Sequence, residues 1–274
     1  MSVDRVSLGI PAYGSQSKDW WGPLVKQAAE LHAQDIQLCD LHVVSSMMTD
    51  VARNHIVEEF LQSDAEWLRW LDADNVDKLG SLRRLLDTKK TLVTGIYTKR
   101  NDSGDLVAYF SAGEGEYTPV NHGYIPGEIF PIDSAGMGGC LVHRTVFEDI
   151  QRNYFLFDMS IGGIIAIHKG DIQGDVFDDA MANYDNKVIE GVYHLRLRQT
   201  RKKKPFPFFM LGFGRTEDYG FYEMAARCGH KLWLDTGVEV GHIGGKVYVP
   251  AEQRQREVQE LRRRFYEPLA WRQA

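Results

Sequence analysis

The sequence contains few cysteines. Cys39, Cys140 and Cys228 are the three cysteines in 274 residues, an odd number, and no CxxC pair occurs. Disulfide frameworks and cysteine zinc sites are built from paired cysteines at characteristic spacings. Both kinds of site are therefore disfavoured, and we expect three buried thiols.

Long apolar runs are also missing. No stretch approaches the roughly 20 apolar residues that a membrane helix needs. The N-terminal segment MSVDRVSLGIPAYG carries an acidic residue and no long apolar segment. A secretory signal is not expected there, so we predict a cytoplasmic protein with no membrane span.

A net positive charge is also absent, because 38 acidic residues outnumber 32 lysines and arginines and the formal net charge is −6. This total gives no general attraction to nucleic acid. A local exception is the segment 196–204, which has six cations in nine positions and no acidic residue. The chain also lacks a glycine-rich, lysine-containing phosphate loop near its N-terminus, which disfavours a nucleotidyltransferase.

Strand-like and helix-like segments alternate over the first hundred residues. Apolar patterns predict strands at 6–10, 35–44, 67–71 and 92–97, and helices at 20–33, 48–62 and 76–88. This order predicts an α/β fold with a mostly parallel central sheet flanked by helices and joined by right-handed crossovers. Ligands of such sheets bind beyond the carboxyl ends of the strands.

The second half is less regular. Residues 100–130 are rich in glycine and turn formers, which indicates a loop or hairpin. Further predicted elements are a strand at 137–143, a helix from Thr145, weak strands within 155–214, a helix at 217–228 ending at Gly229, a strand at 231–235 and a helix after Pro250. We expect one domain over 1–245 with an insertion at about 155–209, followed by a helical extension at 246–274.

An acidic motif follows one of the predicted strands. In EWLRWLDADNVD, residues 66–77, an apolar run ends in Asp72, Asp74 and Asp77. Side chains at i and i+2 of an extended segment point the same way, so Asp72 and Asp74 can converge on one ligand. Two hard oxygen donors suit Mg²⁺ or Mn²⁺, and the alternative is a solvated polar turn.

Three further residues have side chains suited to binding. Arg53 and Asn54 lie near the start of a predicted helix, where a guanidinium can pair with phosphate and an amide can read a base edge or a sugar hydroxyl. His242 lies in a glycine-flanked segment, from which an imidazole can approach a metal. The alternatives are a solvated arginine and a hydrogen-bonded structural histidine.

Several motifs together resemble a known family. SLGIPAYG, ARN, WLDADN, VTGIYTKR, DSAGMGGCLVHRTVFE and TEDYGFYEMAARCGHKLWLDTGVEVGHIG occur in the order found in glycosyltransferases of the GT-A fold. The whole is similar to small family-2-like enzymes of bacteria and their phages, over about residues 5–150 and 210–245. The resemblance implies a Rossmann-like catalytic domain with a nucleotide-sugar-binding half at 1–100 and an acceptor half at 130–245.

The resemblance also implies roles for particular residues. A nucleoside-diphosphate sugar would be bound through Pro11, Tyr13, Arg53, Asn54, Asp72, Gly138 and Gly139. A divalent ion, Mn²⁺ or Mg²⁺, would be held by Asp72, Asp74 and His242. Asp218 matches the aspartate that removes the acceptor proton in inverting members, with Glu217 beside it.

The acceptor and the competing functions stay open at this point. Arg201, Lys202, Lys203, Lys204 and Phe206 join cations to aromatic residues, which is typical of a surface that binds single-stranded or base-flipped DNA. A hydroxylated base in phage DNA is thus one acceptor, a glycan or lipid carrier is another, and a solvated loop is the alternative reading of the run. A sugar- or nucleotide-binding protein without transfer activity is the competing function.

Overall fold

The computed structural model describes residues 3–12, 31, 34–45, 48–96, 98–99, 105–113, 116–120, 124–159, 163–171, 188–189, 195–198, 206–210 and 216–242. Within these ranges, side chains are not described for 76–77, 155–167, 171, 188–198 and 242. The predicted helix at 20–33 falls almost entirely outside the described residues, and the predicted extension at 246–274 falls wholly outside them.

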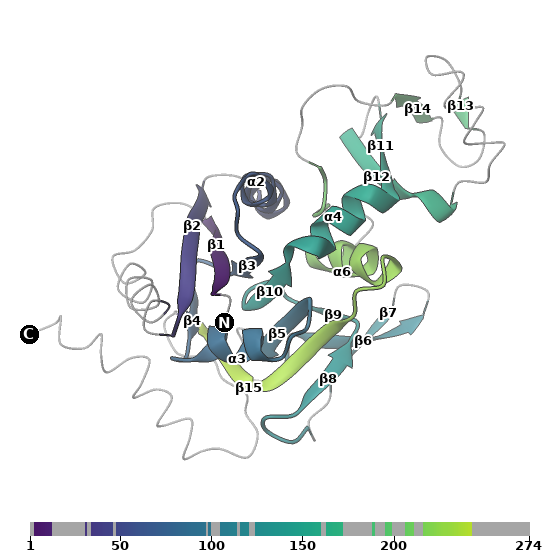
Figure 1. The fold of residues 1–274 in the computed structure, drawn as a ribbon. Coiled ribbons are helices and arrows are strands. Elements are labelled where there is room, and N and C mark those ends of the chain that lie inside the picture. Colours follow the sequence, from purple (N-terminus) through teal and green to yellow (C-terminus); the bar gives the residue numbers. More distant parts are fainter. Residues whose placement is uncertain are drawn as a thin grey trace, which may run out of the picture.

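A central sheet organises the chain (Figure 1). Its strand order is β2-β1-β3-β10-β5-β15-β4, with β8 also paired to β15. Strands β1, β2, β3, β5 and β15 run in one direction, whereas β10, β4 and β8 run against them. The strands are β1 (Asp4–Ala12), β2 (Ile36–Ser45), β3 (Trp67–Trp70), β4 (Asn75–Asp77), β5 (Leu92–Ile96), β8 (Ile129–Ile132), β10 (Cys140–His143) and β15 (Leu232–His242).

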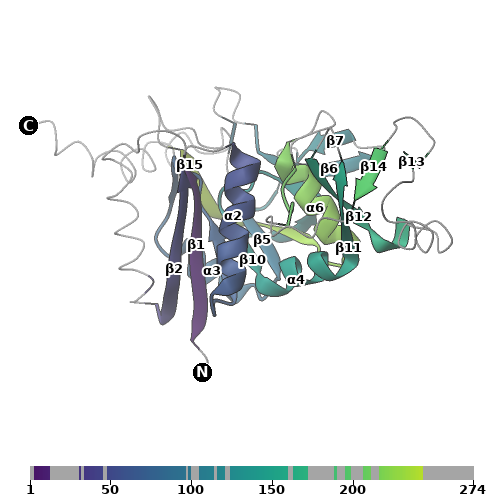
Figure 2. The same cartoon turned by 90° about the horizontal axis from the view of Figure 1, so that it is seen from above.

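Four described helices cover this sheet. They are α2 (Thr49–Gln62), α3 (Ser81–Asp87), α4 (Arg144–Asn153) and α6 (Glu217–Arg227). Side chains of α2, α4 and α6 pack in one hydrophobic cluster, and side chains of α3 pack in another. Alternate residues of a strand point to opposite faces, and accordingly Leu68 belongs to the first cluster and Trp67 to the second. The sheet therefore carries a core on each face, and Figure 2 shows α2 lying beside β1.

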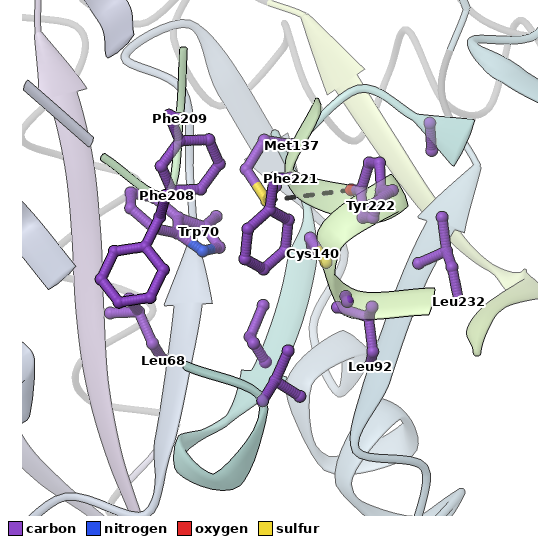
Figure 3. Close-up of a cluster of buried hydrophobic side chains, with 14 of the residues drawn as sticks. Leu68, Trp70, Leu92, Met137, Cys140, Phe208, Phe209, Phe221, Tyr222 and Leu232 are labelled. Atoms are coloured by element: carbon purple, nitrogen blue, oxygen red, sulfur yellow. Dashed lines mark hydrogen bonds between the residues drawn. The ribbon is translucent and has the colours of Figure 1, made fainter. Parts of the chain in front are cut away.

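Aromatic rings dominate the first cluster (Figure 3). Phe221 of α6 stacks on Phe209 with ring centroids 4.8 Å apart, and Trp70 of β3 meets the same Phe209 edge-on at 5.5 Å. Phe147 of α4 lies 5.2 Å from Phe208. The segment Phe206–Met210 is therefore built into the core that joins β3, α4 and α6.

Two smaller sheets flank the central one. The first has the order β12-β11-β14-β13, from β11 (Tyr154–Met159), β12 (Gly163–His168), β13 (Val188–Ile189) and β14 (Leu195–Arg198). The second has the order β7-β6-β9, from β6 (Ala108–Gly113), β7 (Glu116–Pro119) and β9 (Ser134–Ala135). A short 3₁₀ turn, η1, covers Lys169–Asp171.

The α/β fold and the mostly parallel direction of the central sheet are confirmed. The predicted helix at 76–88 is wrong in its first part, because Asn75–Asp77 is strand β4 and the helix begins only at Ser81. Antiparallel pairing with β15 provides hydrogen bonds for this segment, and Gly80 then turns the chain with φ +83°. The predicted strand at 137–143 begins later, at Cys140, because Gly139 has φ +87°.

Most other predicted elements in the described part of the chain agree with the structure within a few residues, but the strand predicted at 231–235 continues to His242. The region 100–130 contains the hairpin β6–β7, and the weak strands of 155–214 form the sheet of β11 to β14. Gly229 has φ +88° just beyond α6, as expected for a helix C-terminus. In the described part of the chain, no helix is long and apolar enough to cross a membrane.

Close contact between β5 and β15 gives a test of the packing. A Cβ at Gly95 would lie 2.5 Å from Val238 Cγ1 and 2.7 Å from the Val238 carbonyl oxygen. We expect Gly95→Ala to lower the free energy of unfolding by about 1–3 kcal/mol through overpacking, measured by urea denaturation.

The matched control is Gly220→Ala in α6. A Cβ there meets nothing within 4 Å, and alanine in a helix is favoured over glycine by about 1 kcal/mol. The control is expected to unfold at higher urea than the parent protein. Equal destabilisation by both substitutions would contradict the packing described for Gly95.

Candidate functional site

The site lies where β3 ends and β10 begins. The Gly139 amide donates to the Trp70 carbonyl oxygen over 3.0 Å, and the Arg69 side chain donates to the Gly139 carbonyl oxygen. Because β10 runs against β3, its first residues lie at the carboxyl end of β3. The acidic motif after β3 and the glycines before β10 therefore share one rim of the sheet, where a ligand is expected.

A buried arginine is at the centre of this rim. The Arg53 side chain, on α2, is 4% exposed. Its guanidinium donates to Glu217 Oε1 over 2.9 Å, to Asp72 Oδ1 over 3.2 Å and to Asp218 Oδ1. One guanidinium thus joins carboxylates of the motif after β3 to both acidic residues at the start of α6.

Without a partner, burial would make the ionised forms of these carboxylates unfavourable in free energy. The side chains of Glu217 and Asp218 are 10% and 14% exposed, and that of Asp72 is 28% exposed. Ionised groups out of water need a partner of opposite charge. Arg53 supplies that partner, and the N-terminus of α6 adds a favourable dipole for the two residues of its first turn.

Asp218 has an unusual acidity. Burial raises the pKa of its carboxyl from 3.8 to about 7; Arg53 opposes this shift, and the negative charges of Glu217 and Asp72 add to it. The Met137 amide also donates to Asp218 Oδ2 over 3.2 Å, which favours the ionised form. Between pH 3.8 and about 7 this carboxyl is ionised in the unfolded chain but protonated in the folded protein. Its contribution therefore lowers the free energy of unfolding as the pH rises through this range, and it is constant above about pH 7.

The turn after β3 is closed by its own side chains. The Asp72 amide donates to Asn75 Oδ1 over 2.9 Å, and the Asn75 amide donates to the Asp72 carbonyl oxygen over 2.9 Å. Gly138 lies against this turn, where a Cβ would be 2.6 Å from Asp72 Oδ2 and closer still to Asn75 Oδ1. Glycine at 138 is therefore required for the close approach of the two segments.

Asn54 and Phe209 form a second contact between remote segments. Asn54 Nδ2 donates to the Phe209 carbonyl oxygen over 2.8 Å, and the Phe209 amide donates to Asn54 Oδ1 over 2.9 Å. The Phe209 ring also lies beneath Arg53, with Cζ 5.7 Å from its centroid. Asn54, predicted to contact a donor, uses both ends of its amide to hold the segment Phe206–Met210.

The predicted metal ligands fall on neighbouring backbone segments. Strand pairing sets His242 of β15 opposite Asn75 of β4, the residue after Asp74. The side chain of His242 is outside the described residues. Among described side chains, no group of three His, Cys, Asp or Glu is gathered as a metal site. Asp72 and Asp74 are half-buried carboxylates at the rim, so their donor chemistry fits Mg²⁺ or Mn²⁺.

The remaining predicted site residues are dispersed. Pro11 is buried near the carboxyl end of β1, paired with Val44 of β2. Phe206 is half-buried, with its ring 4.6 Å from that of Phe208. Tyr13 and the basic residues Arg201, Lys202, Lys203 and Lys204 lie outside the described residues.

Two contributors to the site were missed by the sequence motifs. Met137 acts through its backbone amide, which no residue pattern reveals. Phe209 belongs to the aromatic run PFPFFM, and this run was a signal for a buried segment. The run does not indicate that Phe209 packs beneath Arg53 and its carboxylate partners.

The chain is similar to several solved structures at low identity. Protein A197 from STIV has 14% identity and a TM-score of 0.49, and the match covers 91% of this chain and 95% of that one. A structure of GalNAc-T7 with UDP, GalNAc and Mn²⁺ has 11% identity and a TM-score of 0.42, and the match covers 88% of this chain and 44% of that one. A glycosyltransferase involved in glycosylation of the major capsid of PBCV-1 has 14% identity, a TM-score of 0.29 and coverage of 52% and 62%.

No protein-family model and no curated protein matches the sequence. At identities of 10–14%, the likeness to the solved structures concerns architecture only. Function is therefore inferred from the residues of the site.

The Arg53 cluster makes a prediction about stability. Arg53→Met would leave three carboxylates, 10–28% exposed, without their shared cation, and breaking a buried ion pair costs about 3–5 kcal/mol. We expect a loss of this order in urea unfolding at pH 8, and a smaller loss at pH 5, where Asp218 is protonated in the folded state.

Arg5→Met is the matched control. Arg5 pairs with Asp64 and Glu66 at 3.1 and 3.8 Å, but its side chain is 37% exposed. Exposed pairs contribute about 0–1 kcal/mol, so this variant should unfold nearly like the parent. A loss for Arg53→Met no larger than that for Arg5→Met would show that the cluster is not the buried ion pair described above.

Proposed function

We propose that the protein is a metal-dependent glycosyltransferase that moves a sugar from a nucleoside-diphosphate sugar to a hydroxyl acceptor. The observation that carries this proposal is the joining of Asp72 to Glu217 and Asp218 through buried Arg53. Sugar transfer needs an acidic group for the donor's metal and a base for the acceptor. The cluster supplies carboxylates for both tasks within the reach of one side chain.

The donor side of the site is assigned to Asp72 and Asp74, with His242 as a third candidate. These residues would hold Mg²⁺ or Mn²⁺. When bound, such an ion stabilises the negative charge that develops on the leaving diphosphate, without proton transfer. Gly138 keeps the backbone beside Asp72 free of a side chain, whereas Gly139 accommodates Val240, and the Asp72 carboxylate is 28% exposed and so accessible to a ligand.

The acceptor side is assigned to Asp218, with Glu217 beside it. An acceptor hydroxyl must lose its proton as it attacks the anomeric carbon, and a positioned carboxylate can take that proton. A pKa of about 7 allows Asp218 to be ionised at neutral pH and still be basic enough to accept it. Direct attack with Asp218 as base gives inversion at the anomeric carbon, and this is the stereochemistry we propose.

Two other functions make different predictions. A sugar- or nucleotide-binding protein without transfer activity should release no nucleoside diphosphate, and a nucleotidyltransferase should release pyrophosphate. The site favours transfer because metal-side and base-side carboxylates are present together. The hypothesis of DNA as acceptor rests on the basic run of Arg201 to Lys204, which lies outside the described residues.

Donor hydrolysis tests the metal side. A thermal-shift screen of nucleotide sugars with Mn²⁺ first identifies the donor, because a ligand bound to the folded state raises the Tm. With that donor, we expect Asp74→Ala to reduce release of nucleoside diphosphate by about 100-fold, as for loss of an essential metal ligand or its supporting groups. Asp64→Ala, at a side chain that is 71% exposed, should hydrolyse the donor like the parent protein.

The acceptor base can be tested through the pH dependence of kcat/KM. Because Asp218 must be ionised, transfer should rise with pH and level off above about 7. Asp218→Asn should reduce kcat by about 10²–10⁴-fold, the range of general-base contributions, with donor binding unchanged. Arg53→Lys should move the rising limb to higher pH, because weaker pairing relieves less of the Asp218 shift. A pH profile identical in Asp218→Asn and the parent would rule out this residue as the base.

A further inference from the structure

A group of tyrosines lies next to the proposed base. The ring of Tyr219, on α6, is 5.6 Å from that of Tyr109 and 4.4 Å from that of Tyr117. In the hairpin, Tyr109 pairs with Pro119 and Ser111 pairs with Tyr117. Alternate residues of a strand share a face, so both hairpin tyrosines lie on the face toward α6. All three side chains are half-buried, so part of each ring is open to solvent.

This tyrosine face is connected to the proposed base by one covalent link and by one route through strand pairing and a hydrogen bond. Tyr219 directly follows Asp218 at the start of α6. On the hairpin side, Tyr109 of β6 pairs with Ser134 of β9. Three residues beyond Ser134, the Met137 amide donates to Asp218 Oδ2. The Asp218 carboxylate is also close enough to Tyr219 for its negative charge to contribute, together with burial, to the raised pKa of that hydroxyl.

The polar groups at this face are neutral or negatively charged, and a hydrogen bond orients one of them. The Tyr117 hydroxyl donates to Glu223 Oε1 over 2.8 Å, one turn after Tyr219 on α6. Burial, and then the neighbouring Tyr109, raises the pKa of Tyr219 above its ordinary value, so its hydroxyl stays neutral. Half-buried aromatic surface with a few oriented polar groups is typical of small-molecule sites.

The charge of the surrounding chain argues against a polyanionic acceptor. Between Arg100 and Arg144 the sequence has six acidic residues and no lysine or arginine. Helix α6 adds Glu223, and also Glu217 and Asp218, which pair with Arg53. Nucleic-acid binding draws most of its affinity from cations on phosphate, whereas Glu116 beside Tyr117 and Glu223 on α6 disfavour a phosphate backbone here. A neutral, hydroxyl-rich ring meets no such penalty.

On these grounds we propose that Tyr109, Tyr117 and Tyr219 form the acceptor subsite and that the acceptor is a neutral carbohydrate. The C–H face of a sugar ring packs on the tyrosine rings, and its hydroxyls bond to the Tyr117 hydroxyl and the Glu223 carboxylate. This inference rests on the proposed function and specifies its acceptor. In the transfer step, the acceptor oxygen bonds to the anomeric carbon and its proton passes to Asp218. The bond from that carbon to the diphosphate oxygen breaks, and the diphosphate keeps the electron pair.

Phe110 provides a matched control within the same strand. It lies between Tyr109 and Ser111, so its side chain points to the opposite face of the hairpin. It is 41% exposed, and its ring is stacked with that of Phe130 at 6.5 Å. Removing this ring changes the same hairpin without touching the tyrosine face.

The experiment measures binding and transfer separately. Saturation-transfer NMR with a panel of neutral methyl glycosides reports binding without turnover, and transfer assays use the same glycosides with the identified donor. We expect at least one glycoside to bind. Tyr117→Ala should raise its dissociation constant and acceptor KM at least about tenfold, as for loss of one stacking partner, and leave donor hydrolysis within about twofold. Tyr117→Phe keeps the ring and should show a smaller rise, and Phe110→Ala should show none.

The possible failures are distinguishable. If no glycoside binds the parent protein, or if Tyr117→Ala and Phe110→Ala bind it equally, the subsite is wrong even when donor hydrolysis is normal. Transfer to DNA carrying hydroxymethylated pyrimidines, with no transfer to glycosides, would overturn it in favour of a nucleic-acid acceptor. Glycoside binding without hydrolysis of any nucleotide sugar would instead contradict the proposed function and leave a carbohydrate-binding face.

Discussion

The buried guanidinium of Arg53 is the interaction on which the site depends. Glu217 and Asp218 are 164 and 165 positions away from it in sequence, and Asp72 is 19 positions away. Without a cation between them, carboxylates from these segments would repel one another in a place that is largely shielded from water. The rigid planar fork of arginine suits this role, because it can donate to several oxygens at once. A lysine would offer a point charge with less directional control.

The adjacent residue, Asn54, connects the same helix to the hydrophobic core. Through it α2 holds the backbone of Phe209, whose ring stacks on Phe221 of α6 and meets Trp70 of β3. The ring of Phe209 also lies beneath Arg53. Two successive residues of α2 therefore fix the charged cluster and the apolar layer below it; Figure 3 shows Phe209, Phe221 and Trp70 of that layer. Tight packing in that layer limits how far the start of α6, and with it Asp218, can move.

The sequence predicts the parts of the fold that follow from local pattern. Apolar runs identify β1, β2, β3 and β5, and amphipathic spacing identifies α2 and α6, because burial on a sheet or a core imposes those periods. It does not predict that β10 runs antiparallel between β3 and β5. The assignment of Asn75–Asp77 to a helix also fails, since the pairing of this segment with β15 is a contact between residues more than 160 positions apart.

The candidate site, like the fold, is predicted by the sequence only in the parts that depend on local pattern. Asp72 and Asp74 were identifiable because carboxylates that follow a buried strand call for a partner, whereas Glu217 and Asp218 were assigned through the family resemblance. The partner itself was assigned differently: Arg53 was expected to meet phosphate, whereas its guanidinium lies among Asp72, Glu217 and Asp218. Which anion an arginine pairs with depends on residues brought near it by the whole fold. Local sequence carries no information on that distance.

The charge balance of the cluster explains how a group suited to act as a base arises here. Arg53 carries one positive charge against the carboxylates of Asp72, Glu217 and Asp218, so full ionisation leaves an excess of two negative charges. Burial raises the pKa of Asp218 from 3.8 to about 7, and the negative charges of Glu217 and Asp72 add to that rise. The Arg53 and Met137 donors prevent a larger rise. The acidity of Asp218 is thus set by the balance between burial and two donors, and a pKa near neutrality is where a general base works best.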